Sequence, residues 1–216
     1  MYQISPVYAR VVLRHLQQQE VPLASFFAGT GLDSTRLHRE DSIAMADFLR
    51  LLRNAAQLPG GETLGLLIGR HSNVMTLGAV GAAVAAAPSL GDALRAIESF
   101  SRLHASYIRV DLAANLRGLS FGISYSEDLG DTRRFHSESA VSLLQNHLET
   151  ITGRRLDDAH YSMDYSLPDY AEHYVEHFHS PISFGHSQCR IDLPAHWLTE
   201  ASPCLLYTSP SPRDHG

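Results

Sequence analysis

Histidine is the residue type in this sequence with the most obvious chemical capacity, and the chain contains 13 histidines. His173 and His177 stand four positions apart. Imidazoles at that spacing lie one helical turn apart and can share one metal ion. The nearest glutamate precedes His177 instead of following His173, which is not the metalloprotease order, and the sequence identifies no third ligand. We therefore expect a solvated helix face with no cofactor, and keep His173 and His177 as the metal candidates.

Two further motifs approach catalytic or nucleotide-binding patterns but lack essential residues. Segment 185–189 nearly matches the G-x-S-x-G nucleophile elbow, yet Cys189 replaces the second glycine and the residues after it alternate like a strand. Segment 78–83 is rich in glycine and alanine but has neither the Walker lysine nor a full G-x-G-x-x-G. Because no base, nucleophile and orienting partner assemble in the chain, we expect no catalytic residues and no enzyme.

The charge balance is acidic, with 17 Lys and Arg against 23 Asp and Glu and a formal net charge of -6. Such a field repels phosphate, so we expect this chain not to bind DNA strongly by itself. Segment 23–37 does have the order of a helix, a glycine-containing turn and a second helix that is typical of a DNA-binding motif. Acidic neighbours oppose its Arg36 and the nearby Arg39, which disfavours phosphate contacts.

Cysteine usage and the N-terminus indicate the compartment. Cys189 and Cys204 are the only cysteines, too few for a disulfide framework, so we expect a reducing cytoplasm. Arg10, Arg14 and His15 interrupt the N-terminal segment, which therefore lacks the apolar run of a signal peptide or membrane helix. We expect no association with a membrane.

Hydrophobic periodicity predicts helices first and strands later. Helices are predicted after Pro6, at 23–28, after Ser42, at 62–70, after Ser89, and from Asp131 or Thr132 to Gly153. After His104 the apolar period changes to two, and two alternating runs joined by a turn at 113–115 predict an antiparallel hairpin. Further strands are predicted at 160–165, 182–184 and 189–193, with a helix that contains Tyr170, Tyr174 and Phe178. This order predicts an α+β fold, with an N-terminal helical segment followed by a mixed or antiparallel sheet with packed helices.

Three local features refine this prediction. Ser89 and Asp92 form an S-x-x-D capping signature at the start of a helix. Segment 77–87 has so few polar groups that we expect it to be buried. Segment 204–216 turns abruptly to Ser and Pro and resembles a cloning or sequencing adapter, so we expect a disordered tail that is not native.

Several motifs together resemble a known family. They are Thr76 to Gly81, Ala86 to Leu94, Leu64 to Leu66 with Gly69, and the run from Pro168 through Tyr170, Tyr174, Phe178, Pro181, Ile182 and Phe184 to Gly185. In this order and spacing they resemble the N-terminal, arabinose-binding-like sensor domain of AraC-type regulators, over about Ile4 to Pro203. The resemblance implies a cytoplasmic sensor domain at 1–203 that binds a small metabolite. It also implies that DNA is bound through a C-terminal helix-turn-helix domain beginning beyond Pro203, absent from this chain.

The resemblance supplies no ligand contacts, so candidate pocket residues follow from chemistry alone. Polar groups at helix–strand junctions can orient a metabolite in an otherwise apolar cavity. The candidates are Arg102, His104 and Tyr107 at the first junction, and His136, Glu138 and Tyr161 around the next helix and strand.

We also expect a homodimer, for which the helix from Asp131 to Thr152 could supply an interface. Two other classes of function stay open at this point. One is a small hydrolase or metal-dependent enzyme that uses the histidine-rich second half, and the other is a purely structural dimerisation module.

Overall fold

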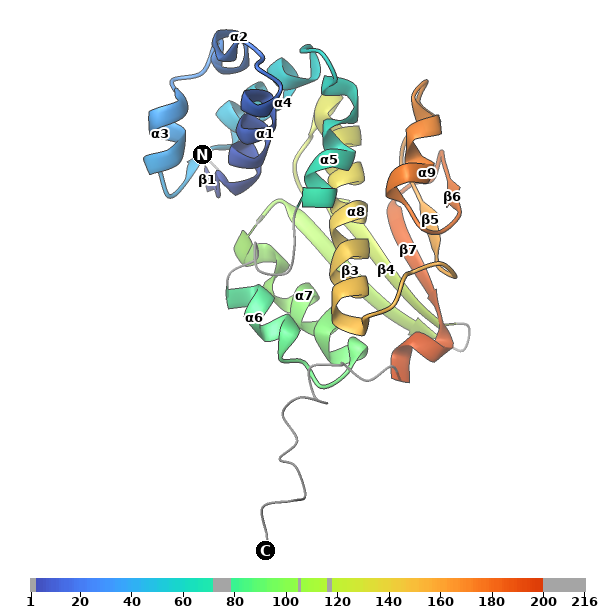
Figure 1. The fold of residues 1–216 in the computed structure, drawn as a ribbon. Coiled ribbons are helices and arrows are strands. Elements are labelled where there is room, and N and C mark those ends of the chain that lie inside the picture. Colours follow the sequence, from blue (N-terminus) through green and yellow to red (C-terminus); the bar gives the residue numbers. More distant parts are fainter. Residues whose placement is uncertain (1–2, 72–78, 105, 116–117, 200–216) are drawn as a thin grey trace, which may run out of the picture.

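The computed structural model describes residues 3–71, 79–104, 106–115 and 118–199 (Figure 1). Helices form the N-terminal part, and a five-stranded sheet with packed helices follows. The α+β prediction is confirmed. The tail at 204–216 lies outside the described residues.

The N-terminal helices enclose a first core. Its elements are β1 (Gln3–Ile4), α1 (Val7–Gln18), α2 (Leu23–Phe27), α3 (Ser34–Arg39), β2 (Ile43–Ala44) and α4 (Met45–Ala56). β1 and β2 pair antiparallel and hold the start of α1 near α4. Apolar residues at helical spacing, such as Val12, Leu16 and Phe48, are buried together. Hence this part of the chain is a helical lobe with its own apolar interior.

Segment 23–37, which has the helix order of a DNA-binding motif, forms the two short helices α2 and α3. The Asp33 side chain caps α3 by accepting a hydrogen bond from the Arg36 amide at 2.8 Å. The Arg36 guanidinium contacts the Gly31 carbonyl and lies 3.7 Å from the Glu40 carboxylate. Arg36 is thus engaged within its own segment.

The large sheet has the strand order β3-β4-β7-β5-β6. The strands are β3 (Ile108–Asn115), β4 (Gly118–Tyr125), β5 (His160–Ser162), β6 (Ile182–Ser183) and β7 (Cys189–Pro194). Ile108 pairs with Tyr125, which confirms the predicted antiparallel hairpin. β4, β7 and β5 continue antiparallel, and only β6 runs parallel to its neighbour β5 among the described strands.

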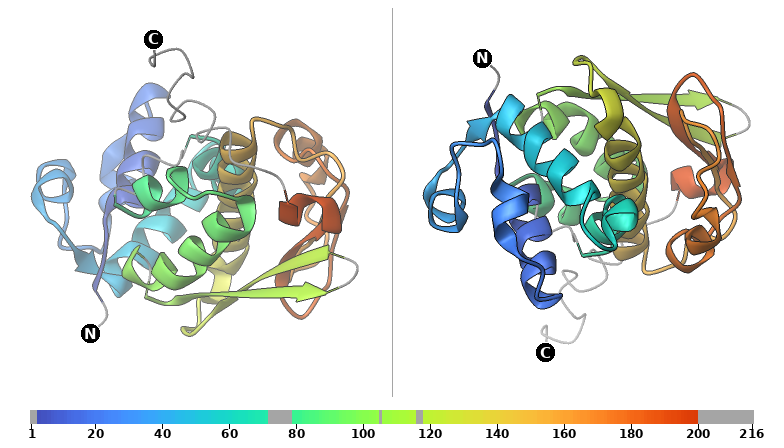
Figure 2. Two further views of the ribbon diagram at one scale, coloured as in Figure 1. Left: turned by 90° about the horizontal axis from the view of Figure 1, so that it is seen from below. Right: turned by 90° about the horizontal axis from the view of Figure 1, so that it is seen from above.

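Helices cover one face of this sheet. They are α7 (Leu90–His104) and α8 (Arg133–Thr152), and α6 (Ala79–Ala85) packs against α7. Figure 2 shows α7 and α8 on the same side of the β3–β4 hairpin. Alternate strand residues such as Phe121 and Ile191 face these helices, while Arg109 and Arg190 on the opposite face are exposed. The covered face forms a second core.

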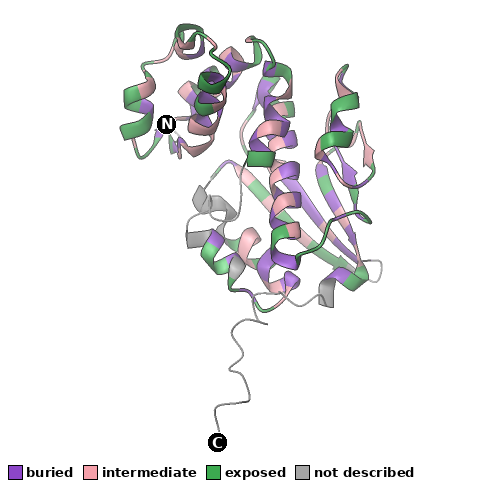
Figure 3. Ribbon diagram, viewed as in Figure 1, coloured by how far each residue is buried: buried purple, intermediate pink, exposed green. Residues whose placement is uncertain are grey.

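The two cores meet where α5 (Leu64–His71) packs against α8. A side chain at Gly65 or Gly69 would collide with α8, so these glycines allow the two helices to approach closely. Eleven residues of α8 are buried, on several sides of the helix (Figure 3). The structure therefore does not support α8 as a subunit interface, because most of its surface is covered within the chain.

Some local predictions are confirmed and others are wrong. Ser89 accepts a hydrogen bond from the Asp92 amide at 3.2 Å, as the capping signature predicts. In segment 77–87, Val84 and Ala87 are buried but Ala82 is exposed, so the prediction of a buried segment is wrong in part. The first two residues of that segment lie outside the described ones. Among the described helices, none combines the length and apolar character needed to span a bilayer.

Candidate functional site

Three consecutive polar residues near the start of α8 are buried. His136 is 4% exposed, Ser137 is fully buried and Glu138 is 1% exposed. Successive residues on a helix point about 100° apart, so the three side chains enter three different surroundings. α8 can bury all of them because both cores and α5 surround it.

The Glu138 carboxylate meets a cluster of tyrosines from the segment before β6. Its Oε1 atom accepts hydrogen bonds from the Tyr170 hydroxyl at 2.5 Å and the Tyr174 hydroxyl at 2.6 Å. Tyr174 also shares a hydrogen bond of 2.9 Å with the Tyr165 hydroxyl. Burial raises the pKa of Glu138 to about 7, although the two tyrosines and the nearby Arg134 guanidinium lower it. At neutral pH this side chain is therefore poised between its neutral and charged forms.

A cavity of about 210 Å³ lies beside Glu138. It is lined by Leu52, Arg53, Ala56, Gln57, Gly61, Glu62, Asp131, Thr132, Arg134, Phe135 and Glu138. Charged groups of both signs surround it, and one pair, Arg53 and Asp131, forms an ion pair of 2.6 Å. The Arg134 guanidinium lies 4.9 Å from the centre of the Tyr170 ring. We call this space the Glu138 cavity.

His136 enters an aromatic environment on another side of α8. Its ring contacts Phe48, Tyr107, Tyr125 and Phe135 edge to face, with centroid distances of 5.5–6.1 Å. Burial lowers the pKa of His136 to about 4, so the ring is neutral at neutral pH. The structure thus brings two predicted pocket residues, His136 and Tyr107, together.

Ser137 belongs to a buried polar network that sequence reasoning missed. Its hydroxyl donates a hydrogen bond of 2.8 Å to Asp164, whose side chain is 1% exposed. Asp164 also pairs with Arg133 at 2.7 Å and accepts a contact from the Cys189 thiol at 3.1 Å. Burial, followed by the Asp164 charge, raises the pKa of Cys189 to about 12. Nothing in the sequence pattern around Asp164 marks it as buried.

Tyr161 lies further along α8 than the other candidates. Its hydroxyl donates a hydrogen bond of 2.7 Å to Gln145, which also accepts from the His179 amide at 2.9 Å. Gln145 follows Glu138 by seven residues, or roughly 10 Å of helix. Tyr161 therefore does not share a site with Glu138 or His136, and its role as a ligand contact stays a prediction.

The remaining predicted pocket residues, Arg102 and His104, belong to the last turn of α7. Their side chains lie outside the described residues.

The metal candidates lie on a short, mostly exposed segment. The predicted helix is a 3-10 turn at Ala171–His173 followed by α9 (Tyr174–His177). His173 is exposed, and burial lowers the pKa of the half-buried His177. Within the described residues, no group of three or more His, Cys, Asp and Glu side chains is placed to hold a metal ion. The pair therefore has no third ligand in that part of the chain.

The near-match to a nucleophile elbow leads into strand β7 (Cys189–Pro194). The sequence prediction of a strand here is confirmed. His186 is hydrogen-bonded to Ser183 at 2.7 Å, which ties this turn to β6.

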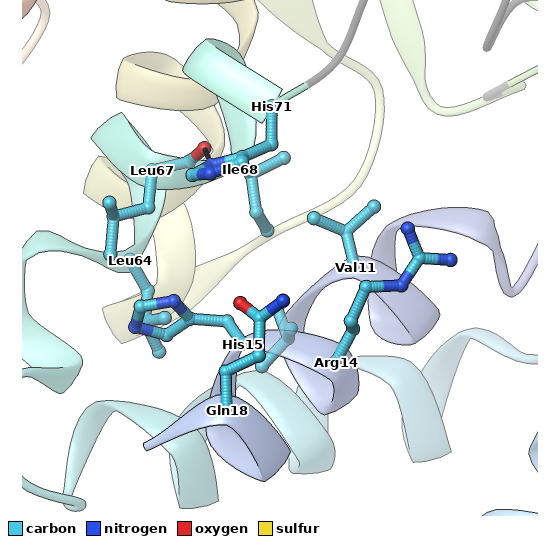
Figure 4. Close-up of a pocket in the computed structure, with 9 residues that line it drawn as sticks. Val11, Arg14, His15, Gln18, Leu64, Leu67, Ile68 and His71 are labelled. Carbon is cyan, nitrogen blue, oxygen red and sulfur yellow. Dashed lines mark hydrogen bonds between the residues drawn. The ribbon is translucent and has the colours of Figure 1, made fainter.

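A further cavity of about 200 Å³ lies between α1 and α5. Figure 4 shows residues of the two helices facing one another across it. Burial, followed by the charge of His71, lowers the pKa of His15 on its wall. Its walls come only from the helical lobe and α5, whereas the Glu138 cavity also includes α8.

Comparison with known proteins gives matches over most of the chain. The model of the family described as the arabinose-binding domain of AraC transcription regulators, N-terminal, matches residues 21–201. The ornithine utilization regulator of Pseudomonas aeruginosa is 26% identical over 163 residues, which are 76% of this chain and 46% of that protein. The crystal structure of the transcriptional regulator CdpR from Pseudomonas aeruginosa has a TM-score of 0.65 at 18% identity, covering 92% of this chain and 58% of that one.

The chain thus spans about half the length of these relatives. The similarity to CdpR concerns the fold, since the sequences have diverged, whereas the family match rests on the sequence itself. It extends from α2 through the sheet and includes every residue of the Glu138 cavity. The chain belongs to the family of N-terminal arabinose-binding domains of AraC transcription regulators.

Proposed function

We propose that this chain is the metabolite-sensing part of an AraC-type regulator, with its effector bound in the Glu138 cavity. A C-terminal helix-turn-helix domain outside this sequence would bind the DNA. The observation that carries the proposal is the buried Glu138 carboxyl group in the wall of a cavity between α4 and α8. Tyr170 and Tyr174 already donate to this carboxyl group, but burial raises its pKa to about 7, and a residue with a shifted pKa beside a cavity is a candidate for ligand binding.

The chemistry of the cavity favours an effector with an ammonium group. Glu138 supplies a carboxyl group, and Arg53 from α4 and Arg134 from α8 supply positive charge. A zwitterion with an additional amine would find partners of both signs there. One relative is named as a regulator of ornithine utilization, and ornithine is a basic amino acid. We therefore propose a small basic amino acid or a related amine.

The position of the cavity supports a regulatory role. Its walls come from α4 of the helical lobe and from the start of α8, which also packs on the sheet. A ligand that contacts both elements binds most tightly to one arrangement of the lobe and the sheet. It thereby shifts the population of molecules towards that arrangement. The size of the shift is set by the difference between the ligand's affinities for the two arrangements.

The remaining partners are also part of this proposal. DNA would be contacted by the C-terminal domain, because the net charge of -6 makes this chain a poor ligand for phosphate. We propose a cytoplasmic homodimer, since most oligomeric regulators pair through two-fold symmetry. Light scattering coupled to gel filtration tests the pairing, and a monomer at high concentration would contradict it.

Thermal unfolding and calorimetry with a panel of metabolites test the effector. We expect ornithine, lysine or putrescine to raise the melting temperature, and norvaline, which lacks the side-chain amine of ornithine, to have a smaller effect. Glu138→Gln should weaken binding of the active amine by about tenfold or more, which corresponds to about 1.4 kcal/mol. Glu176→Gln, at an exposed carboxylate outside the lining of this cavity, is the control and should change the affinity little. Equal binding of the amine to Glu138→Gln and the unchanged protein would contradict the assignment of the site.

A further inference from the structure

Helix α1 has two faces that differ in chemistry. One face packs into the core of the helical lobe through residues such as Val12 and Leu16. A neighbouring face lines the cavity of about 200 Å³ between α1 and α5, which we call the α1–α5 cavity. The residues of this face occupy positions i, i+3, i+4 and i+7 on one side of the helix and are Val11, Arg14, His15 and Gln18. Three of these four residues are polar, so α1 presents a polar strip to the cavity.

The opposite wall, on α5, is mostly apolar. Its residues in the lining are Leu64, Leu67, Ile68 and His71. Figure 4 shows the side chains of Arg14 and Gln18 rising from α1 on the side that faces α5. The cavity therefore has a polar wall and an apolar wall that face each other.

Arg14 supplies a permanent positive charge without a partner. Among the residues that the structure describes, its guanidinium has neither an ion pair nor a hydrogen bond, and none of those that line the cavity is acidic. Arg10, one turn earlier on α1, is different, because its guanidinium donates to the carbonyl oxygens of Leu37 and Glu40 at 2.8 Å and 2.6 Å. Arg10 thus joins α1 to α3, whereas the exposed Arg14 is free to contact a ligand.

His15 and His71 add to the positive potential of the cavity. Burial, followed by the charge of His71, lowers the pKa of His15, so the two rings interact across the gap between the helices. The His71 Nδ1 atom lies 2.8 Å from the Leu67 carbonyl oxygen, which can only accept, so Nδ1 carries a proton. An anion in the cavity would offset the repulsion between the protonated rings and give Arg14 a counter-charge.

The two walls together define the class of ligand. An ammonium group would find only positive side chains there. A small inorganic anion would use the polar wall and leave the apolar wall in contact with water. A carboxylate on an apolar body fits both walls, and guanidinium groups pair with carboxylates through parallel hydrogen bonds. Since a cavity of about 150 Å³ accommodates benzene, the α1–α5 cavity has room for one aromatic ring or a short aliphatic chain.

We propose that the α1–α5 cavity binds a small organic monocarboxylate, with its carboxylate at Arg14 and Gln18 and its apolar body against Leu67. The site shares no lining residue with the Glu138 cavity and takes a ligand of opposite charge. α1 also precedes residues 21–201, which match the family model, so membership of the family does not imply this site. Binding here consequently does not depend on the amine proposed above.

Calorimetry on the full chain tests the class of ligand. The probes are benzoate and hexanoate, together with benzamide, which has the ring of benzoate without the charge, and acetate, which has the charge without the apolar body. We expect benzoate or hexanoate to bind saturably and at least about tenfold more tightly than benzamide and acetate, because only the larger carboxylates use both walls. Absence of saturable binding of both would overturn the proposal, as would equal affinity for benzamide or acetate.

Variants test the location of the site. Arg14→Gln removes the charge at an exposed position and should weaken binding of the active carboxylate at least about tenfold. Val11→Phe narrows the cavity with Arg14 intact and should weaken binding to a similar extent. Arg39→Gln makes the matched change at an exposed arginine of α3, outside the lining, and should bind like the unchanged protein. Undiminished binding to Arg14→Gln or to a folded Val11→Phe variant, or an equal loss in Arg39→Gln, would overturn the proposal.

NMR of the histidine rings locates the carboxylate in the unchanged protein. The ring resonances of His15 and His71 should move as the carboxylate binds, because both rings line the cavity. Those of His160 on β5, outside the lining, should stay in place. Saturation of the protein without movement of either His15 or His71 would overturn the proposal.

Discussion

The side-chain amide of Asn146 on α8 donates a hydrogen bond of 2.6 Å to the carbonyl oxygen of Gly69 on α5. Two turns earlier on α8, the Ser139 hydroxyl makes the equivalent contact to the carbonyl oxygen of Gly65, which lies one turn earlier on α5. Both contacts require the helix backbones to lie close together, and the absence of a side chain at each glycine permits this. The contact between α5 and α8 is therefore set by backbone approach as well as by apolar packing.

Replacement of Gly69 by alanine should separate these helices. Its added carbon would collide with Ser142 of α8, so we expect the free energy of unfolding to fall by about 1–3 kcal/mol despite the better helix propensity of alanine. Urea denaturation measures the change. Gly91→Ala is the matched control, because this helical glycine has its nearest neighbour at 3.7 Å and should tolerate alanine or gain slightly. Equal stability of the two variants would contradict the close-packing argument.

Glu138 should make the protein less stable as the pH rises. Its pKa is about 7 in the folded chain and 4.5 as an ordinary carboxyl group, so between these values the folded state holds a proton that the unfolded state releases. The stabilising contribution is complete below about pH 4.5 and is lost as the pH rises through 7. The full loss is on the order of 3 kcal/mol.

The measurement compares the unchanged protein with Glu138→Gln by urea denaturation from pH 5 to pH 8. The variant should lose less stability across this range, because the amide keeps an oxygen acceptor for Tyr170 and Tyr174 and does not ionise. Glu62→Gln, at an exposed position, serves as the control. Parallel curves for Glu138→Gln and the unchanged protein would show that Glu138 ionises normally.

His136 should have the opposite effect, on the acid side. Its pKa is about 4 when folded and 6.5 when unperturbed, so the unfolded state binds a proton first as the pH falls. Stability from the neutral ring is present above about pH 6.5 and is lost as the pH falls through 4, by on the order of 3 kcal/mol. His136→Phe should lose less stability than the unchanged protein between pH 7 and pH 4.5. An equal acid loss in both would argue that the ring is protonated in the folded state.

Cys189 should be almost unreactive in the folded protein. The thiol is fully buried, and its pKa is raised to about 12. Since the thiolate is the reacting form, iodoacetamide at pH 8 should modify Cys189 at least about 1,000-fold more slowly than in denaturant. Mass spectrometry of the peptide that contains Cys189 follows the reaction. Rapid modification under native conditions would mean that the Asp164 network opens readily.

Periodicity predicted much of the fold. The β3–β4 hairpin and the capped helix α7 each have one buried face, which produces a clear alternation or helical stripe in the sequence. The helix at Tyr170–Phe178 is shorter than predicted, because its residues are placed by contacts such as that of Tyr174 with Glu138. Such long-range contacts have no local signature.

The candidate site was harder to predict, for a physical reason. A polar residue on a helix normally faces solvent, and Ser137 and Glu138 have no local feature that indicates burial. They are buried because two cores enclose α8, which depends on elements far apart in the chain. Their positions at helix–strand junctions predict pocket roles for His136, Tyr107 and Glu138, but the separation of the His136 ring from the Glu138 cavity depends on the rotation of α8.

The position of α8 also affects how the chain unfolds. Its apolar residues belong to the core beneath the sheet, its His136 ring lies among Phe48 and Tyr107 of the helical lobe, and α5 contributes to both cores. Neither half can lose its structure without exposing apolar surface of the other. The two halves should therefore melt as one cooperative unit, with the calorimetric enthalpy equal to the van't Hoff enthalpy, despite having separate apolar interiors.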